Sequence, residues 1–472
     1  MRARARAREP TAASRGPTPC DSEADGESPD GRGHSRGTPC RAIREPYAPR
    51  GTRAPTGCGG GTTARDGGEN GGENGGESVE DIQVRDPATE PGRTGAGPTG
   101  DPSAPMRRAL QLAAEARPVA PPWPWVGCVL VRDGQVVGEG RTGPYPGGPH
   151  AEVAALTAAG PAARGATAYV TLEPCDHHGN TPPCTDALLA AGVAEVVVAQ
   201  GDPDPRVAGR GLARLRAAGV AVRVGDGADA AAAMLAPYLH QRRTGRAYVV
   251  AKWASSLDGR VAGADGSARW ITGPAARADA HRLRAASQAV VVGSGTVLAD
   301  RPSLTVRDAP SPPRPPWRVV LDGRGRVPAT GPLFDPELAP TLVCTTGAAP
   351  PERVAEWRRR GAQVEVVPAG PGGGVDLAEV LSRLAGRYGV VQAMVEGGPG
   401  VHAGLVRAGL VDRFVVYVAG ALLGRDARPA LDLAVPGLES APRLVVVEAA
   451  VCGGDARLVL EPAPAAEPDG RP

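Results

Sequence analysis

Residues 150–184 constrain this chain of 472 residues more than any other segment. The segment carries His150 and Glu152 at the start of an apolar-periodic run, and it carries Cys175 and Cys184 after a run rich in β-forming residues. One imidazole and two thiolates supply three metal ligands, and a hydrolytic zinc site uses three protein ligands so that water can take the fourth position. The segment therefore predicts a zinc site with His150, Cys175 and Cys184 as its ligands.

Glu152 lies beside these ligands without being needed as one. A free carboxylate next to a metal-activated water can carry its proton, and zinc deaminases use this arrangement. A lone H-x-E pattern is common in helices, so the prediction depends on the two cysteines that follow it. We expect Glu152 to be the catalytic proton carrier of a hydrolytic deaminase.

The loop between the two cysteines indicates which deaminase the chain resembles. The general deaminase signature reads P-C-x-x-C, whereas here the loop between the thiols runs from residue 176 to residue 183. The sequence PCDHHGNTPPC resembles the P-C-x-H-x-G-x-T-P-P-C loop of the pyrimidine deaminase in bacterial riboflavin biosynthesis. That family usually fuses the deaminase to a reductase. His177 and His178 lie in this loop, where histidines more often contact solvent or substrate than bind metal.

Composition divides the chain into four parts. Residues 1–104 are rich in Gly, Pro and Arg, with GGEN repeats and almost no apolar periodicity, so they cannot bury enough surface to offset chain entropy. We expect a disordered low-complexity extension there, a deaminase domain at 105–243, a reductase domain at 247–462 and a disordered tail at 463–472. Met106 opens a segment that resembles the usual start of the family's deaminase, so the residues before it are an extension or a misassigned start.

Charge and hydropathy exclude several classes of protein. The chain has 53 Lys and Arg against 51 Asp and Glu and only 3% aromatic residues, which argues against nucleic acid as a partner. No run approaches the roughly 18 apolar residues of a membrane helix, and the basic N-terminus lacks the apolar stretch of an export signal. Few cysteines fit a reducing cytoplasm. We expect a cytoplasmic enzyme that binds a phosphorylated pyrimidine and does not contact a membrane. The sequence leaves open whether the protein forms a homo-oligomer.

Alternating helix and strand signals predict an α/β first domain whose sheet is covered on both faces. Asp133 and Gly134 mark a hairpin turn, and Thr181 is expected to cap a helix that holds Cys184 in its first turn and ends before Gly192. The thiolates and the imidazole then lie near helix N-termini, where the dipole favours anionic sulfur. The resemblance implies a cytidine-deaminase-like α/β/α domain of three layers. The other expected elements are helices at 106–116, 150–159 and from 228 towards 243, and strands at 166–172, from 195 and at 220–224.

The second domain resembles the reductase half of the same enzyme along most of its length. The resemblance implies an α/β fold related to dihydrofolate reductase, with NADPH as cofactor. A glycine-rich turn, VEGGPG, follows a strand at 392–396 and opens a helix at Pro399, and backbone N–H groups at such a turn bind phosphate. The other matching segments are YVVAKWASSLDGRVA (248–262), WITGP (270–274), LRA (283–285) and GSGTVLADRPSLTVR (293–307).

The resemblance also implies roles for residues of the second domain. Guanidinium groups suit phosphate because they bond it in a bidentate manner, and Lys252 is a candidate catalytic proton donor by position. The implied substrate contacts are Ala268, Arg284, Leu304, Arg307 and Glu396. The implied cofactor contacts are Ala254, Trp270, Thr296, Asp300, Gly323, Gly398, Pro399 and Gly400.

The chain departs from the family pattern at five positions, none of them a zinc ligand. Trp123 and Asp204 stand where the family usually has Asn, Asn180 where it has Arg, and Ala268 and Gly323 where it has Ser.

The prediction is a bifunctional enzyme of riboflavin synthesis. Its first domain would remove the 2-amino group of a diaminopyrimidine ribosyl phosphate by zinc-dependent hydrolysis, and its second would reduce the ribosyl group to ribityl with NADPH. Two alternatives stay open. One is a homologue with a decayed activity, and the other is a nucleic-acid-editing deaminase, against which the balanced charge and the second domain argue.

Overall fold

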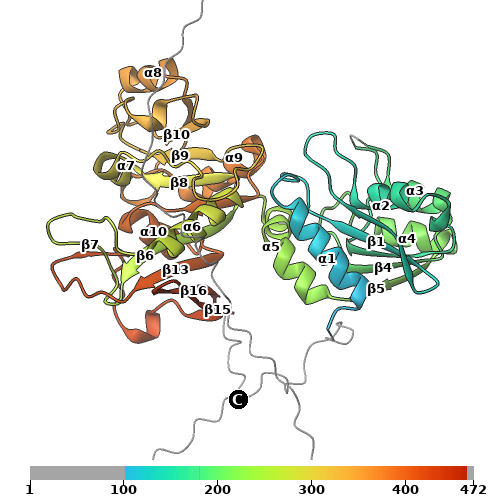
Figure 1. The fold of residues 1–472 in the computed structure, drawn as a ribbon. Helices are drawn as coiled ribbons and strands as arrows, with labels where there is room; N and C mark the ends of the chain where they lie inside the picture. The colour runs from blue at the N-terminus through green and yellow to red at the C-terminus, as the bar shows by residue number, and fades with distance from the viewer. Residues whose placement is uncertain (1–100, 180, 465–472) are drawn as a thin grey trace, which may run out of the picture. The chain divides into compact units, whose positions relative to one another are not determined.

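The computed structural model describes residues 101–179 and 181–464, and Figure 1 shows their fold. The expected extension and tail lie outside the described residues except at their inner ends, where Ala104 already opens the first helix. Asn180 lies outside them as well. Among the helices of the described ranges, none combines the length and apolar character needed to cross a membrane.

The first sheet has five strands in the order β2-β1-β3-β4-β5. β1 pairs antiparallel with β2 and β3, whereas β3, β4 and β5 run parallel. The strands are β1 (Gly127–Arg132), β2 (Gln135–Arg141), β3 (Thr167–Leu172), β4 (Glu195–Gln200) and β5 (Ala221–Val224). The helices are α1 (Ala104–Ala116), α2 (Ala151–Ala159), α3 (Cys184–Ala191), α4 (Arg210–Ala217) and α5 (Ala228–Thr244), with a 3-10 turn at Gly160–Ala163.

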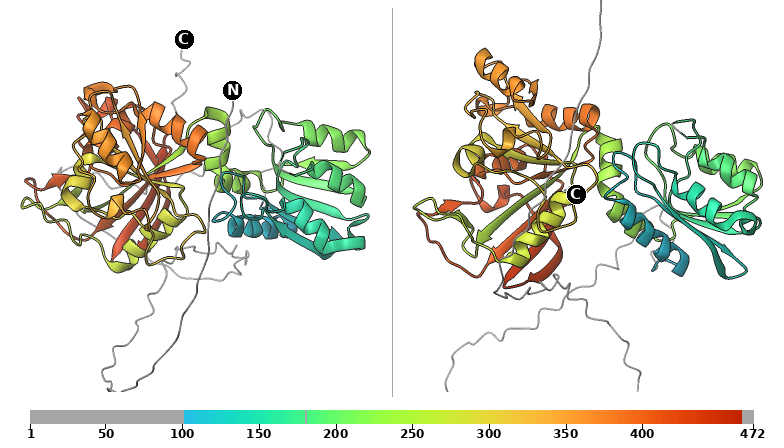
Figure 2. Two further views of the ribbon diagram at one scale, coloured as in Figure 1. Left: turned by 90° about the horizontal axis from the view of Figure 1, so that it is seen from above. Right: turned by 45° about the horizontal axis from the view of Figure 1, so that its top comes forward.

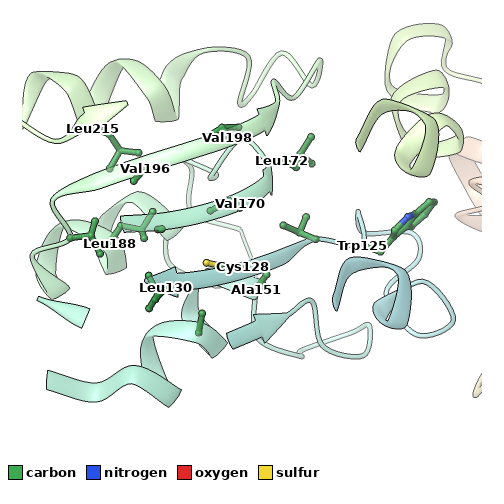
Figure 3. Packing of buried hydrophobic residues seen from close by; sticks show 14 of the residues in the cluster. Trp125, Cys128, Leu130, Ala151, Val170, Leu172, Leu188, Val196, Val198 and Leu215 are labelled. Carbon is green, nitrogen blue, oxygen red and sulfur yellow. The ribbon is translucent and has the colours of Figure 1, made fainter. Parts of the chain in front are cut away.

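The period-two alternation of the strands sends side chains to two different cores. Cys128 and Leu130 of β1 pack with residues of α2, α3 and α4, as Figure 3 shows for the labelled side chains. Val129, between them, packs with Met106 of α1 and Ala231 of α5. Helices therefore cover both faces of the sheet, which Figure 2 shows from two further directions, and the expected three-layer α/β/α architecture is confirmed.

The start of α3 differs from the expected one. The helix begins at Cys184 with Pro183 as its N-cap residue, and Thr181 does not cap it. Pro182 precedes another proline, which disfavours helical backbone there, and Pro183 itself is extended with ψ of 139°. The first turn therefore cannot form before Cys184. The hairpin turn at Asp133 and Gly134 forms as expected, with φ of 51° and 74°.

The second sheet has nine strands in the order β11-β10-β9-β8-β12-β6-β13-β16-β15. Its strands from β11 to β13 run parallel, and β16 and β15 add an antiparallel edge. The strands are β6 (Tyr248–Ser256), β8 (Ala289–Gly293), β9 (Trp317–Leu321), β10 (Thr341–Thr345), β11 (Gln363–Val366), β12 (Gln392–Val395), β13 (Arg413–Ala419), β15 (Leu444–Cys452) and β16 (Asp455–Pro462). A separate two-stranded sheet pairs β7 (Arg260–Ala262) with β14 (Arg428–Pro429).

Helices cover this sheet too, and its inner parallel strands are buried on both faces, whereas the edge strand β11 is partly exposed. Val290 and Val292 belong to one core cluster, whereas Val291 between them belongs to another. A continuous apolar run of this kind is typical of a parallel strand covered on both sides. The helices are α6 (Pro274–Ala285), α7 (Ser294–Asp300), α8 (Pro351–Arg359), α9 (Leu377–Tyr388) and α10 (Pro399–Arg407), with 3-10 turns at Pro332–Phe334, Pro371–Gly373 and Leu438–Ser440.

Candidate active sites

Three segments of the first domain bring the predicted zinc ligands together. His150 precedes α2 as its N-cap residue, Cys184 is the first residue of α3, and Cys175 lies in the loop after β3. Their ligand atoms lie within 4.8 Å of one another. The imidazole Nδ1 is 3.1 Å from the Cys184 Sγ and 3.6 Å from the Cys175 Sγ. Ligand atoms around a tetrahedral zinc lie roughly 3.5 Å apart when the bonds are about 2.0–2.3 Å, so this donor set fits zinc.

The electrostatics of the two thiols favour a thiolate at this place. A hydrogen bond from the Cys184 side chain, with a further one from His150, lowers the pKa of Cys175 to about 4 although burial opposes the shift. The same thiol pair raises the pKa of Cys184 well above its usual value. The pair therefore favours the thiolate form at Cys175, and a bound divalent metal ion would deprotonate the remaining coordinating thiol.

Glu152 lies in the first turn of α2 and is only 4% exposed. Burial is the main cause that raises the pKa of Glu152 to about 7, and the charge of Cys175 adds to it, while His150 acts in the opposite direction. A carboxyl group that titrates near neutral pH can both accept and donate a proton during one reaction cycle. Its burial beside the predicted ligands suits a proton carrier, and the role expected from the sequence stays a prediction.

A cavity of about 230 Å³ opens beside these groups. Glu152, His150 and Cys175 line it. Other residues singled out in the sequence also line it, namely Trp123, His177, Thr181 and Asp204. The Trp123 ring meets the His150 ring edge-on, with centroids 5.8 Å apart. The family's usual amide at this position is thus replaced by an aromatic wall of the pocket.

Two features of this pocket escaped the sequence analysis. The Thr181 hydroxyl lies 3.3 Å from the second ring nitrogen of His150, so the residue expected as a cap instead contacts the metal-ligand imidazole. A hydrogen bond to the distal nitrogen of a ligating histidine fixes its ring and tautomer. The two prolines between Thr181 and Cys184 indicate this placement in the sequence. Because they prevent the helix from starting before Cys184, Thr181 stays in the loop.

The second feature concerns Asp204, one of the departures from the family. Its buried carboxylate accepts bonds of 3.0 and 2.7 Å from the Arg206 guanidinium, and Arg242 lies 3.7 Å away. These arginines, Arg206 foremost, lower the pKa of Asp204 to about 2. The extra negative charge that replaces the family's amide is therefore paired.

The second domain contains a cavity of about 1090 Å³ at the carboxyl ends of its parallel strands, where ligands of open α/β sheets bind. Arg284, Leu304 and Arg307 are not among its lining residues. The residues that line it include every implied cofactor contact, namely Ala254, Trp270, Thr296, Asp300, Gly323, Gly398, Pro399 and Gly400, together with Lys252, Ala268 and Glu396.

Arg284 is engaged inside the protein rather than open to the cavity. Its guanidinium forms a bidentate pair with the Glu396 carboxylate, one bond of which measures 2.7 Å, and donates to the Thr305 carbonyl at 2.8 Å. Burial opposes ionisation of Glu396, but the charge and hydrogen bonds of Arg284 outweigh it, and with the charge of Lys252 they lower the pKa of Glu396 to about 2. Glu396 therefore remains an anion in the cavity wall.

Lys252 and His402 complete this corner of the cavity. Burial lowers the pKa of Lys252, against the charge of Glu396, which raises it. His402 was not singled out in the sequence, although it lies in the first turns of α10, just after the glycine-rich segment. It is buried against Trp253, and burial together with the charge of Lys252 lowers the pKa of His402 to about 4, so its imidazole is neutral.

Leu304 and Arg307 lie on the loop that follows α7. Leu304 is buried with φ of 54°. The Arg307 guanidinium contacts the hydroxyl groups of Ser303 and Thr305 at 2.8 and 3.3 Å. An arginine held by neutral hydroxyl groups keeps its charge available for an anionic ligand, so its expected phosphate contact stays a prediction.

Two family models match the chain. The model described as RibD C-terminal domain matches residues 247–456, and the model described as cytidine and deoxycytidylate deaminase zinc-binding region matches residues 101–200. The riboflavin biosynthesis protein RibD of Chlamydia pneumoniae is 42% identical over 361 residues, which cover 76% of this chain and 95% of that protein.

Two solved structures are similar over most of their length. Acinetobacter baumannii RibD is 40% identical with a TM-score of 0.69, covering 76% of this chain and 98% of that one. A diaminohydroxyphosphoribosylaminopyrimidine deaminase/5-amino-6-(5-phosphoribosylamino)uracil reductase from Thermotoga maritima is 31% identical with a TM-score of 0.67 and the same two coverages. In each of these proteins, one chain thus contains counterparts of both domains of this chain.

Proposed function

Since this chain belongs to the RibD family of riboflavin biosynthesis proteins, we propose how its own residues carry the two reactions of a deaminase and reductase. The chain is a bifunctional enzyme that uses zinc in one domain and NADPH in the other. Its substrate would be 2,5-diamino-6-(5-phosphoribosylamino)pyrimidin-4-one, deaminated within residues 105–243 and then reduced within residues 247–462. The observation that supports the proposal most strongly is the convergence of His150, Cys175 and Cys184 beside buried Glu152.

In the first domain His150, Cys175 and Cys184 would hold the zinc ion. A zinc ion held there would supply Lewis acidity, which makes a water molecule a stronger nucleophile towards the ring carbon bearing the amino group. Glu152 would take one proton from this water as its oxygen adds to the carbon, and pass that proton to the neighbouring ring nitrogen. It would then take the proton of the added hydroxyl group and give it to the amino group, so that ammonia leaves and the carbonyl forms. The neutral-range pKa of Glu152 supports both directions of transfer.

Other side chains of the first pocket position these groups. The Thr181 hydroxyl holds the ring of His150 through its second nitrogen. Trp123 forms an apolar wall next to His150, where it would restrict the plane of the pyrimidine ring. His177 lines the same pocket and is proposed to contact substrate rather than metal.

In the second domain the glycine-rich turn is proposed to bind cofactor phosphate. A Cβ at Gly397 would lie 2.5 Å from the Val292 Cα, so the turn packs tightly against β8 and only glycine fits there. Gly398 has φ of 61° and precedes Pro399, the first residue of α10. Backbone N–H groups at this helix start suit a phosphate.

Lys252 is proposed as the proton donor of the reduction. NADPH supplies the hydride when it is bound. Lys252 lies in the cavity wall with Glu396, and its ammonium group would protonate the oxygen of the opened ribose as hydride reaches the carbon. The Arg284–Glu396 pair holds the anion beside Lys252 in place.

Two observations weigh against the alternatives. The zinc donor set and Glu152 are complete, and Asp204, one of the departures, has compensating arginine partners, which speaks against decay of the first activity. A nucleic-acid-editing deaminase does not account for the reductase domain matched at residues 247–456.

The decisive experiment uses the purified full chain. We expect about one zinc ion per chain, release of ammonia from the diaminopyrimidine substrate, and oxidation of NADPH in the presence of the deaminated product. Bound zinc with neither activity would identify a decayed homologue. Retention of RNA at physiological salt, without turnover of the pyrimidine, would support the editing alternative.

A further inference from the structure

Two arginine side chains line one corner of the large cavity without an assigned role. Arg324 and Arg326 lie on the loop after β9, and both are exposed. Arg324 donates to the Gly372 carbonyl at 3.2 Å, and Arg326 donates to the Ser294 hydroxyl at 2.5 Å. Within the described residues neither guanidinium forms an ion pair with a carboxylate, so both positive charges face the cavity uncompensated.

The loop that carries this pair is held in place from several sides. The Asp322 carboxylate accepts from the Val327 N–H at 2.7 Å, while the hydroxyl groups of Thr345 and Thr346 donate to the carbonyls of Asp322 and Gly323 at 2.7 Å each. Such bonds fix the backbone before any ligand arrives. The two arginines are therefore presented from a rigid platform, which lowers the entropy cost of binding.

A second loop closes the same corner. A Cβ at Gly323 would lie 3.2 Å from the Gly373 carbonyl oxygen, so the loop of the arginines and the glycine-rich loop 372–374 touch. Gly373 has φ of 73°, a backbone conformation that glycine adopts readily. The corner is thus bounded by small backbone segments and two guanidinium groups, which leaves room for a compact anion.

The position of the pair relates it to the cofactor rather than to the substrate. Arg326 contacts Ser294, the first residue of the helix that carries Thr296 and Asp300, and both of these belong to the proposed cofactor contacts. Within the described residues, Glu396 and Lys252, the proposed groups at the reacting carbon, form no hydrogen bond or ion pair with either arginine. The glycine-rich turn at 397–400 already offers backbone N–H groups for the pyrophosphate.

We propose that Arg324 and Arg326 bind the 2′-phosphate of the adenosine half of NADPH and thereby set the preference for NADPH over NADH. The proposal rests on the proposed reductase function. A guanidinium group bonds a phosphate in a bidentate manner, and dinucleotide sites distinguish a 2′-phosphate by arginine and a free 2′-hydroxyl by a carboxylate.

A carboxylate at this corner would instead favour NADH, because it accepts a hydrogen bond from a free 2′-hydroxyl group. Asp322 also lines the cavity. However, it is 1% exposed, and one of its oxygens is used by the Val327 N–H. Its second oxygen is buried and has no hydrogen-bond partner among the described residues. Burial thus shields this carboxylate, whereas the side chains of Arg324 and Arg326 are exposed.

The test compares two small probes by calorimetry on the full-length protein. Adenosine 2′,5′-bisphosphate carries the 2′-phosphate, and AMP lacks it. We expect the wild-type chain to bind the bisphosphate more tightly than AMP. Arg324→Ala and Arg326→Ala should each weaken bisphosphate binding by about 10- to 100-fold while leaving AMP within about twofold, because each removes charge-assisted hydrogen bonds to the 2′-phosphate alone.

Two further variants make the result specific. Arg326→Lys keeps the charge without the bidentate geometry and should lose less affinity than Arg326→Ala. Arg359→Ala removes an exposed arginine at the end of α8, outside the cavity, and should change neither affinity. Thermal unfolding of each variant establishes that the fold is kept.

The outcomes separate this proposal from the proposed function. Loss of bisphosphate affinity with unchanged AMP affinity supports it. Equal loss for both probes, or no loss in the Arg324→Ala, Arg326→Ala double variant, overturns it while leaving the reductase function standing. A wild-type chain that binds neither probe and oxidises no NADPH overturns the reductase function, and the proposal falls with it.

Discussion

Glu152 illustrates how one buried carboxyl group combines structural and chemical demands. Its position two residues after a metal ligand follows from the start of α2, and the burial that raises its pKa to about 7 comes from packing around it. A solvent-exposed carboxyl group in the same sequence pattern would ionise near its ordinary value and carry protons poorly at neutral pH.

Replacing Glu152 by Gln should greatly slow ammonia release and leave zinc bound. We expect a loss of roughly 100- to 10,000-fold, the usual range for a general acid–base group, with unchanged zinc content because Glu152 is not a ligand. NADPH oxidation should be unaffected. Metal analysis and the two separate assays measure this, with the exposed Glu115→Gln on α1 as a control. Ammonia release at the wild-type rate would refute the proposed role.

The buried pair of Arg284 and Glu396 should matter for stability as well as for the site. Glu396→Gln leaves the Arg284 guanidinium buried without its anion, and we expect the free energy of unfolding at pH 7 to fall by about 3 kcal/mol. Urea denaturation followed by fluorescence measures the change. Glu379→Gln on α9 is the matched control, because its partner Arg383 also pairs with Glu365, and it should cost less than about 1 kcal/mol.

The same pair predicts an acid dependence. The pKa of Glu396 is lowered from its ordinary 4.5 to about 2, so its stabilising contribution is fully present above pH 4.5 and is lost as the pH falls towards 2. In that range the free energy of unfolding should fall more steeply for the wild-type chain than for Glu396→Gln. Parallel slopes would show that the pair is not ionised as described.

At the scale of elements, the contact between β2 and α2 positions His150, the proposed zinc ligand. A Cβ on Gly140 would lie 2.2 Å from the Ala151 carbonyl oxygen and 2.3 Å from the Ala155 nitrogen. The helix therefore lies directly on the glycines of the strand. Because His150 and Glu152 stand at the start of α2, this close approach determines where the imidazole and the carboxylate point.

Gly140→Ala should displace α2 and weaken zinc binding. The added methyl group meets backbone atoms that cannot move without the whole helix, so we expect a loss of more than about 2 kcal/mol in stability and a lower zinc content after dialysis. Gly386→Ala, at an exposed position of α9 with no atom near the added carbon, should instead stabilise by about 0.5–1 kcal/mol. Equal melting temperatures for the two variants would contradict this account.

At the scale of the whole molecule, each sheet carries a core and a site of its own. The first sheet packs its helices around an apolar core, and the proposed zinc donors lie at the starts of α2 and α3 and in the loop after β3. The second sheet has its cavity at the carboxyl ends of its parallel strands. The residues proposed for each reaction come from one domain only. The two activities should therefore respond separately to the loss of their cofactors.

Removal of zinc should abolish ammonia release without affecting NADPH oxidation. After dialysis of the full chain against a chelator at neutral pH we expect no ammonia release and unchanged NADPH oxidation, and added zinc should restore the former. Differential scanning calorimetry should show a lower unfolding temperature for one transition, because a ligand that binds only the folded state stabilises it. Loss of NADPH oxidation on chelation would indicate a metal requirement in the reductase as well.

The sequence by itself predicted a zinc donor set that the fold brings together, and it determined the hairpin turn at Asp133 and Gly134 and the positions of most elements. These follow from local rules: residue types suited to a metal, backbone conformations that need particular residues, and periodicities of helix and strand. The start of α3 was predicted wrongly, with Thr181 as the cap, because the effect of Pro183 on the residue before it was not taken into account.

Only the tertiary structure decided which groups meet. Thr181 contacts His150, Arg284 pairs with Glu396, and His402 lies buried near Lys252 because packing joins segments far apart in the chain. Burial, which sets whether a carboxyl group titrates near 2 or near 7, is likewise a property of the packed molecule. Local sequence states what a side chain can do, and the surrounding fold sets its partners and its charge.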